Sequence, residues 1–317
     1  MSRTYLDFER SVAELESKIS DLQQVGSADV DVSEEIAQLC EKSTRQLEQL
    51  YKNIGAWEKT QVARHPGRPH FSEYVEALIS DYSPLAGDRK FGDDHALLGG
   101  LGRIGPYRVM VMGHEKGKNT ETRLKHNFGM AQPEGYRKAV RLMDMAERFS
   151  LPVISFVDTA GAFPGRGAEE RGQAEAIARC TDRGLSLSVP FISVITGEGG
   201  SGGAVAIATA NKVMMLEHSI YSVISPEGCA SILWRDNKKA QDAAKAMKIT
   251  AQDLKDLGVI DHIVKEPIGG AHRQVSATIK TLGDDICAAL DDLVHISPDD
   301  LIQQRREKFL HIGRSLL

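Results

Sequence analysis

The residues with the clearest chemical potential lie at positions 197–203, where five of seven residues are glycine. Because glycine has no side chain, another molecule can approach this backbone closely. The apolar run 190–195 before it indicates a buried strand, and the small residues 204–210 after it indicate a helix. In a strand–loop–helix arrangement the N–H groups at the helix start point outward unpaired, which suits a phosphate or a developing oxyanion. A tight turn without a ligand is the alternative interpretation.

A second glycine loop, at residues 159–167, follows another predicted buried strand at 152–158. A helix is predicted before that strand, at 133–149, and another after the loop, from 168 to about 183. This alternation of strands and helices predicts right-handed crossovers and a largely parallel, buried sheet. Both glycine loops would then lie at the carboxyl ends of their strands, where open α/β sheets bind ligands.

Four basic residues form a further candidate site: Lys116, Lys118, Arg123 and Lys125. They follow a predicted β-hairpin, in which residues 96–104 and 107–113 are joined by a turn at 105–106. Glutamates at 115 and 121 lie in the same stretch. A solvated loop and a phosphate-binding loop both fit this pattern.

Cysteine and histidine spacing does not indicate a metal site. The cysteines form no C-x-x-C pair, so they fit neither a zinc site nor a disulfide framework and suggest a reducing compartment; they are Cys40, Cys180, Cys229 and Cys287. His65 and His70 lie in a segment with two prolines, which force an extended path and favour a loop. We therefore expect no metal and no resident cofactor on this chain.

The composition is that of a globular protein with one large domain or two small ones. The chain has 317 residues, of which 41% are hydrophobic and 26% charged, with a net charge of −5 and a pI of about 6.1. This charge gives no general basic field for nucleic acid or an anionic membrane. No apolar run approaches the ~18 residues of a membrane span, and the N-terminus has no signal core, so a cytoplasmic location is expected.

The predicted sheet is flanked by mainly helical ends. Residues 5–25 and 33–60 predict an antiparallel helical pair joined by residues 29–32, which either forms an attachment arm or folds onto its own domain. A short helix at 71–82 leads to the hairpin. The remaining pattern predicts strands at 213–216 and 220–225, helices at 226–234 and 238–257 with a Gly258 C-cap, a strand at 260–264, and helices at 274–293 and beyond.

Four motifs, in order along the chain, carry a resemblance to a known family. They are residues 156–165, 168–173, 197–203 and 225–234. Together with residues 269–273 and the helical N-terminus, they resemble the alpha subunits of bacterial acetyl-CoA carboxylase carboxyltransferases over nearly the whole chain. The resemblance implies an α/β protein with a crotonase-like ββα spiral core. It also implies a helical N-terminal extension at 1–35, a carboxyltransferase domain at 36–293 and a peripheral C-terminal helix at 294–317.

The family's activity implies an enzyme that works only with a beta subunit. The two subunits would transfer the carboxyl group from carboxybiotin on the biotin carboxyl carrier protein to acetyl-CoA. The product is malonyl-CoA, formed in the first committed step of fatty acid synthesis. The resemblance also implies an α2β2 hetero-oligomer that works beside biotin carboxylase. The carrier protein would hold biotin, and a zinc ribbon would belong to the beta subunit, in keeping with the missing cysteine pairs here.

The resemblance assigns roles to the two glycine loops. Gly202 and Gly203 would donate backbone N–H groups to the biotin ureido oxygen as the carboxyl group leaves, and the beta subunit would stabilise the thioester enolate. The decarboxylated biotin nitrogen can take the methyl proton, so no protein base is expected. Independently of the resemblance, the charge of the basic residues between 116 and 125 suggests the hypothesis that they steer the CoA phosphates, with a solvated loop as the alternative. The carboxybiotin side would be formed by Gly161, Ala162, Phe163, Gly165, Gly200 and Ser201.

Two other functions compete with this interpretation, and a third is excluded. Residues 199–203 match the G-x-S-x-G elbow of serine hydrolases, with Asp261 and His262 downstream. However, adjacent strand residues point to opposite faces, so Asp261 could hardly orient His262. A non-catalytic scaffold, in which the glycine loops only pack, would be inactive with every partner present. A P-loop nucleotide site is excluded because no G-x-x-x-x-G-K-[ST] motif occurs.

Overall fold

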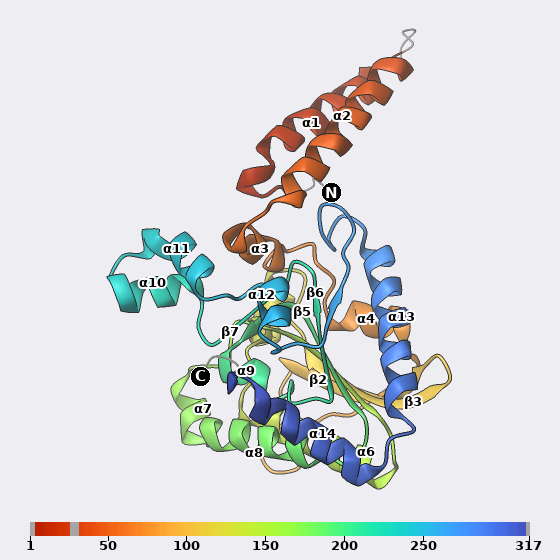
Figure 1. Cartoon of the computed structure of the whole chain (residues 1–317), viewed down its shortest axis with the longest axis vertical. Helices are drawn as coiled ribbons and strands as arrows, with labels where there is room; N and C mark the ends of the chain where they lie inside the picture. Colours follow the sequence, from red (N-terminus) through yellow and green to blue (C-terminus); the bar gives the residue numbers. More distant parts are fainter. Residues whose placement is uncertain (1–3, 26–31, 315–317) are drawn as a thin grey trace.

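An eight-stranded sheet forms the centre of the computed structural model, which describes residues 4–25 and 32–314 (Figure 1). In those residues the strand order is β1-β2-β3-β4-β5-β6-β8, and β7 pairs with the end of β5. β1, β2 and β3 are antiparallel neighbours, whereas every pairing from β3 onward is parallel. The strands are β1 (Ser80–Pro84), β2 (Leu97–Ile104), β3 (Tyr107–His114), β4 (Val153–Thr159), β5 (Phe191–Gly200), β6 (Lys212–Leu216), β7 (Ile220–Ser222) and β8 (His262–Val264).

The predicted parallel, buried core is confirmed. Every residue of β4 and β5 is buried, because apolar side chains pack on both faces of the sheet. Along β4 the side chains alternate between two clusters, so that Val153 belongs to one cluster and Ile154 to the other. The predicted hairpin is also confirmed, since β2 and β3 pair in register across a turn at Gly105.

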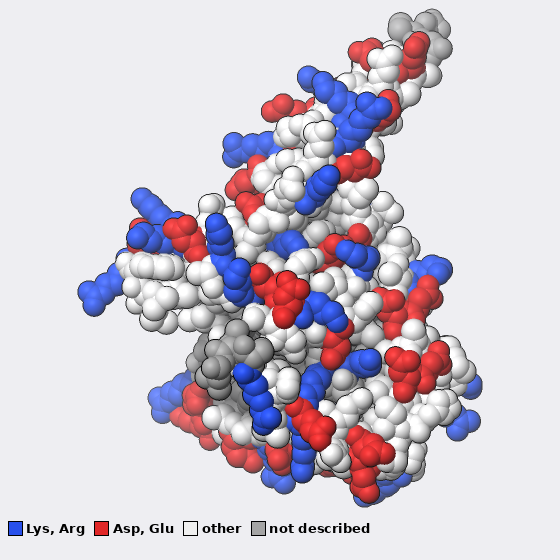
Figure 2. Space-filling model, in the orientation of Figure 1, with Lys and Arg blue, Asp and Glu red and all other residues white. Residues whose placement is uncertain are grey.

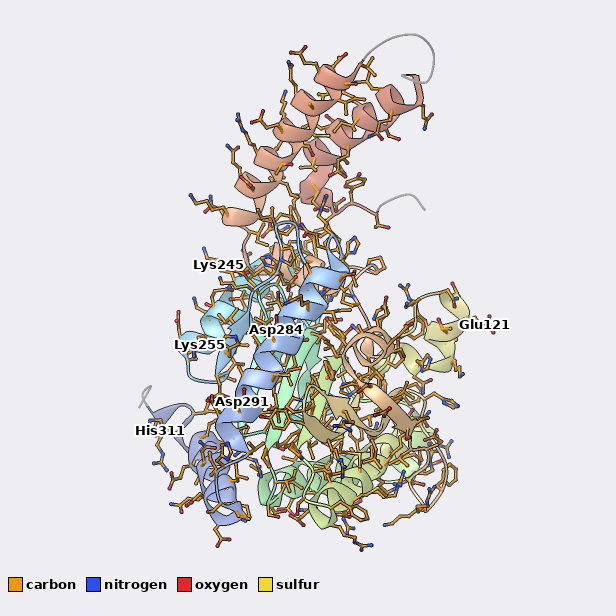
Figure 3. All side chains as sticks on the ribbon, turned by 90° about the vertical axis from the view of Figure 1, so that its right-hand side faces the viewer. Glu121, Lys245, Lys255, Asp284, Asp291 and His311 are labelled. Atoms are coloured by element: carbon orange, nitrogen blue, oxygen red, sulfur yellow. The ribbon has the colours of Figure 1, made fainter. Side chains whose placement is uncertain are left out.

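Helices cover both faces of this sheet. One face carries α6 (Pro133–Arg148), α8 (Gln173–Ser186) and α9 (Ser201–Val205), and the other carries α4 (Phe71–Leu78) and α13 (Val275–Leu293). Figure 3 shows α13, marked by Asp284 and Asp291, lying across its face of the sheet. The helix predicted for the charged C-terminal stretch is confirmed as α14 (Pro298–His311), which packs against α8.

The predicted antiparallel helical pair at the N-terminus is present and projects from the sheet as an arm (Figure 1). It consists of the 3-10 turn η1 (Asp7–Glu9), α1 (Arg10–Val25) and α2 (Ser33–Lys52), and most of the predicted linker at 29–32 lies outside the described residues. The chain leaves helical geometry after Lys52 and starts a new helix, α3 (Ala56–Ala63), so residues 33–60 form two helices, not one. α2 crosses the boundary expected at residue 35, and the division into domains stays a prediction.

Two predicted helices are interrupted where the backbone becomes left-handed. Gly172, with φ +83°, separates α7 (Arg166–Glu170) from α8, and Lys248, with φ +55°, separates α11 (Ala240–Ala246) from α12 (Ala251–Asp256). The predicted C-cap at Gly258 is confirmed, because this residue follows α12 with φ +70°. The remaining helical segments are α5 (Thr120–Lys125), η2 (Asn127–Gly129), α10 (Pro226–Trp234) and η3 (Asn237–Lys239).

The surface carries charges of both signs. Figure 2 shows acidic and basic side chains interspersed over this face of the molecule, as the small net charge leads one to expect. Among the residues that the structure describes, no helix combines the length and the apolar character needed to cross a membrane.

Candidate active site

The two glycine segments meet at the carboxyl ends of the adjacent parallel strands β4 and β5, as predicted. Their backbones touch without side chains between them. A Cβ placed on Gly200 would lie 2.3 Å from the carbonyl carbon of Ala160, and one on Gly203 would lie 2.8 Å from the amide nitrogen of Ala162. Glycine is therefore needed at both positions because backbone from the neighbouring segment occupies the space.

Most of the segment expected to be a loop is strand. Residues 197–200 belong to β5, because β7 pairs with them from Glu198↔Ile220 to Gly200↔Ser222. The turn into α9 begins only at Ser201, whose φ of +51° is a left-handed value that a serine rarely adopts. The helix ends at Val205, where residues up to 210 were expected to be helical. The first N–H groups of α9, including those of Gly202 and Gly203, have no partner within so short a helix.

The second glycine loop is anchored to α8 and to the segment before α6. The N–H of Phe163 donates to the carbonyl of Ala131 (3.0 Å), and the buried Gln173 side chain donates to the carbonyls of Ala131 (2.9 Å) and Phe163 (3.0 Å). Gly161, Ala162, Phe163 and Gly165 are all half-buried. A Cβ on Gly161 would meet no atom within 4 Å, so this position is open to a ligand.

The four basic residues lie in different surroundings. Lys116 is largely buried and its Nζ lies 2.7 Å from Asp158 Oδ1 and 3.4 Å from Glu198 Oε2. Lys118 is exposed and pairs with Glu73 of α4 (2.9 Å), whereas Arg123 and Lys125 lie on α5. Figure 3 shows α5, marked by Glu121, on the opposite side of the molecule from α11, marked by Lys245.

A charge network at the ends of β4 and β5 was not predicted. Arg64 contacts both Glu198 and Glu227 at 2.6 Å, which links β5 to the start of α10. Burial opposes ionisation of Asp158, but Lys116 outweighs it and keeps the pKa of Asp158 below its usual value. The same pairing raises the pKa of Lys116 despite its burial. A carboxylate near the carboxyl end of each of two neighbouring buried strands was the available sequence signal, but the lysine and arginine partners come from distant segments.

This network borders a cavity of about 370 Å³ under the loop that joins α3 to α4. His70 lines the cavity and is 6% exposed, and neither of its ring nitrogens has a hydrogen-bond partner among the described residues. Its Nδ1 lies 4.0 Å from Asp158 Oδ2. Further lining is provided by Arg64, Arg68, Lys116, Arg123, Asp158 and Glu198.

The geometry does not support a serine hydrolase. His262 is level with Met214 of β6 and hence with Val194 in the middle of β5, whereas Ser201 follows the end of that strand. At about 3.3 Å per strand residue, the two side chains lie more than about 10 Å apart. His262 Nε2 instead lies 2.9 Å from Asp285 of α13, on the other face of the sheet.

The segment with the two histidines is a loop, as predicted. The His65 ring stacks on His272 with 3.7 Å between ring centroids, and its Nε2 lies 3.0 Å from the carbonyl of Thr4. Within the described residues no three side chains of the His, Cys, Asp and Glu types are grouped so that they could hold a metal ion.

Comparisons with a family model and with individual proteins point to the same family. Residues 5–313 match the family described as acetyl co-enzyme A carboxylase carboxyltransferase-like. The chain is 64% identical to the acetyl-coenzyme A carboxylase carboxyl transferase subunit alpha of Nitrobacter winogradskyi and 63% identical to that of Rhodopseudomonas palustris. Each match spans 314 residues, 99% of this chain and 98% of the relative.

Solved structures with the same fold are more distant in sequence. A 12S transcarboxylase superposes with a TM-score of 0.59 at 16% identity, over 71% of this chain and 42% of the other. One chain of a Pseudomonas malonate decarboxylase hetero-dimer superposes with a TM-score of 0.57 at 16% identity, over 82% of this chain and 96% of the other. These likenesses confirm the predicted crotonase-like α/β fold.

Proposed function

The chain belongs to the acetyl co-enzyme A carboxylase carboxyltransferase-like family, and from this premise we propose how its residues carry out the reaction. It is the carboxyltransferase alpha subunit, an enzyme component that helps to transfer a carboxyl group to acetyl-CoA and so supplies malonyl-CoA for fatty acid synthesis. The observation that carries the proposal is the meeting of two glycine segments at the carboxyl ends of β4 and β5.

Gly202 and Gly203 provide the oxyanion-stabilising donors in this proposal. Carboxybiotin, delivered on a carrier protein, supplies the carboxyl group, and negative charge develops on its ureido oxygen as that group leaves. Backbone N–H groups at the start of α9 are fixed before the reaction and need no reorganisation, and one such donor contributes about 3–4 kcal/mol. The left-handed φ of Ser201 supports this role, since strained backbone concentrates at functional sites.

The remaining carboxybiotin contacts come from the facing glycine loop. Gly161 leaves open space beside the backbone, so a flat ring can approach it, and Ala162 packs directly on Gly203. Phe163, Gly165, Gly200 and Ser201 complete this side of the site. The CoA phosphates are assigned to Lys118, Arg123 and Lys125, while Lys116 acts within the charge network and not as a free cation.

A beta subunit completes the site from the side of α10. Large apolar side chains are exposed there, including Val223 (81%), Ile232 (70%) and Leu233 (65%). Val223 also lines an apolar cavity of about 460 Å³ whose lining includes Ser201 and Val205, so an apolar partner surface would cover the mouth of the site. We assign this face to the beta subunit, which supplies the enolate-stabilising donors and the zinc ribbon of an α2β2 assembly in the cytoplasm, with the carrier protein and biotin carboxylase as further partners.

The test is co-purification with the beta subunit followed by malonyl-CoA decarboxylation in the presence of biocytin. The assembled complex is expected to be active and the pure chain alone inactive. Leu233→Asp should abolish co-purification because it places a charge in the interface, whereas Leu310→Asp, at the equally exposed Leu310 of α14, should not. Turnover by the pure chain would refute the proposal. A complex that is inactive with every partner present would also refute it and would favour the scaffold interpretation.

A further inference from the structure

Shortly before the glycine turn, β5 has two more residues than β4 between two successive paired positions. The pairing runs from Val157↔Ile195 to Thr159↔Gly199, so that residues 196–198 of β5 face Asp158 alone. A bulge of this kind bends the strand and leaves backbone polar groups without partners in the ladder. Because buried backbone groups need hydrogen bonds, side chains from elsewhere must satisfy them.

Arg68, from the loop between α3 and α4, satisfies the carbonyl of the bulge. Its Nε and Nη2 donate to the carbonyl oxygen of Thr196 at 3.1 and 2.8 Å, and Nη1 and Nη2 donate to Glu266 at 2.8 and 2.9 Å. The residue is 3% exposed, and the carboxylate of Glu266 fixes the plane of the guanidinium. The fork of Arg68 therefore holds the first residue of the bulge.

Asp158 satisfies the N–H at the other end of the bulge. Its Oδ1 accepts from the N–H of Glu198 at 2.9 Å and also lies 2.7 Å from Lys116 Nζ. A Cβ on Gly197 would lie 2.3 Å from this same oxygen, so the middle residue must be glycine for the carboxylate to reach Glu198. Two side chains thus hold the bulge from both ends.

We propose that Arg68 and Asp158, which we call the bulge clamp, are positioning residues that aim the N–H groups of Gly202 and Gly203 at the reacting oxygen. Only residues 199–201 separate the bulge from the first of these donors, so a change in the bend of β5 is carried directly into α9. The clamp touches no substrate in this proposal. The inference rests on the proposed function, because the reaction provides the readout.

The first experiment is Arg68→Lys in the assembled complex with the beta subunit. Lysine keeps a positive charge beside Glu266 but cannot donate through a planar fork to Thr196 as well. We expect kcat to fall about 10²-fold, the loss typical of a displacement near 1 Å, with little change in the KM for malonyl-CoA. The matched control is Arg305→Lys, since Arg305 is also fully buried and donates to backbone carbonyls, at residues 184, 187 and 189, far from β5's glycines.

The second experiment separates positioning from proton transfer at Asp158. Asp158→Asn keeps an oxygen that can accept from the Glu198 N–H, whereas Asp158→Ala removes it. Positioning predicts that the asparagine variant recovers a large part of the kcat lost in the alanine variant, with the pH profile unchanged. An asparagine variant as inactive as alanine, or one with a shifted pH optimum, would show that Asp158 acts through its negative charge and not through the Glu198 N–H, and would overturn the proposal.

These outcomes also distinguish the clamp from the proposed function. An active wild-type complex whose Arg68→Lys and Asp158→Ala variants retain wild-type kcat refutes the clamp and leaves the carboxyltransferase role intact. A loss of melting temperature with unchanged kcat per assembled complex also refutes it, because a merely structural role gives that pattern. An inactive wild-type complex refutes the proposed function and the clamp with it.

Discussion

Gly202 and Gly203 are neighbours in sequence but face different surroundings. A Cβ on Gly202 would meet Ile177 at 3.4 Å, an ordinary contact, whereas a Cβ on Gly203 would meet backbone atoms of residues 161 and 162 at 2.8 Å. A larger side chain at position 203, such as valine, would block a ligand but would also clash with this backbone, so a loss of activity could not be assigned to the ligand. Gly202 is the better position for a substitution that hinders the ligand without lowering the stability of the fold.

We expect Gly203→Ala to destabilise the chain by about 1–3 kcal/mol, because the new methyl group overpacks against fixed backbone. Gly202→Ala should leave the melting temperature close to that of the wild type. Thermal unfolding of both variants checks this difference, and kcat measured on assembled Gly202→Ala complex then reports on the donors. Equal destabilisation by the two substitutions would contradict the contact geometry.

Ser201 contributes backbone conformation and no nucleophile in our interpretation. Ser201→Ala keeps the Cβ and so should retain most of kcat in the assembled complex. Loss of about 10³-fold or more with an unchanged melting temperature would restore the nucleophile hypothesis. Ser201→Gly serves as the companion variant, and it should be at least as stable as the wild type because glycine relieves the left-handed strain.

At the scale of elements, a buried charge cluster joins the N-terminal arm to the body. Arg273, in the loop before α13, lies 3.1 Å from Glu9 and 2.9 Å from Glu16, and Tyr51 of α2 donates to Glu9 at 3.1 Å. Glu9 is completely buried. The base of the arm is therefore fixed to the body, while its far end projects away from the sheet (Figure 1).

Arg273→Ala should loosen this attachment, because removing one partner of a buried ion pair costs about 3–5 kcal/mol. Faster amide hydrogen exchange and proteolysis in α1 and α2, with the sheet still protected, are the expected results. Lys280→Ala removes an exposed pair with Asp284 on α13 and should leave both measurements unchanged. An arm equally protected in the Arg273 variant would show that its attachment does not depend on this cluster.

At the scale of the whole molecule, we expect buried histidines to contribute to the loss of stability in acid. Burial is the main cause that lowers the pKa of five of them: His65, His70, His114, His218 and His272. For His114 the pKa falls to about 4, and neither ring nitrogen has a partner among the described residues. The unfolded chain binds protons at these sites near pH 6.5 and the folded chain does not, so stability falls as the pH drops below that value. Although burial alone would raise the pKa of Glu266, Arg68 lowers it to about 2. Protonation of Glu266 therefore causes a further loss of stability between about pH 4.5 and 2.

His114→Leu should reduce this acid sensitivity. Between pH 6.5 and about 4 the free energy of unfolding should change with pH less steeply, by up to about 1.4 kcal/mol per pH unit for one proton. Chemical denaturation at several pH values measures the slope. His295→Gln, at an exposed histidine, is the control and should leave the slope as it is. An unchanged slope in the His114 variant would mean that this ring is protonated in the folded state.

Local sequence determined the elements and the family. The apolar runs of β4 and β5, the glycine segments after them and the helical periodicities depend on neighbouring residues, so they could be predicted together with the parallel sheet and the ends at which the site lies. The four motifs added the family, which the relatives confirm.

Only the tertiary structure decided which residues act together at the site. Lys116 was grouped with its sequence neighbours as a free cation, but folding places it against Asp158 and Glu198, 42 and 82 positions along the chain. Arg68 reaches Thr196 across 128 positions. Part of the expected glycine loop is strand because β7, a later segment, pairs with residues 198–200. Such long-range pairings depend on where the chain returns in space, and no local pattern encodes that return.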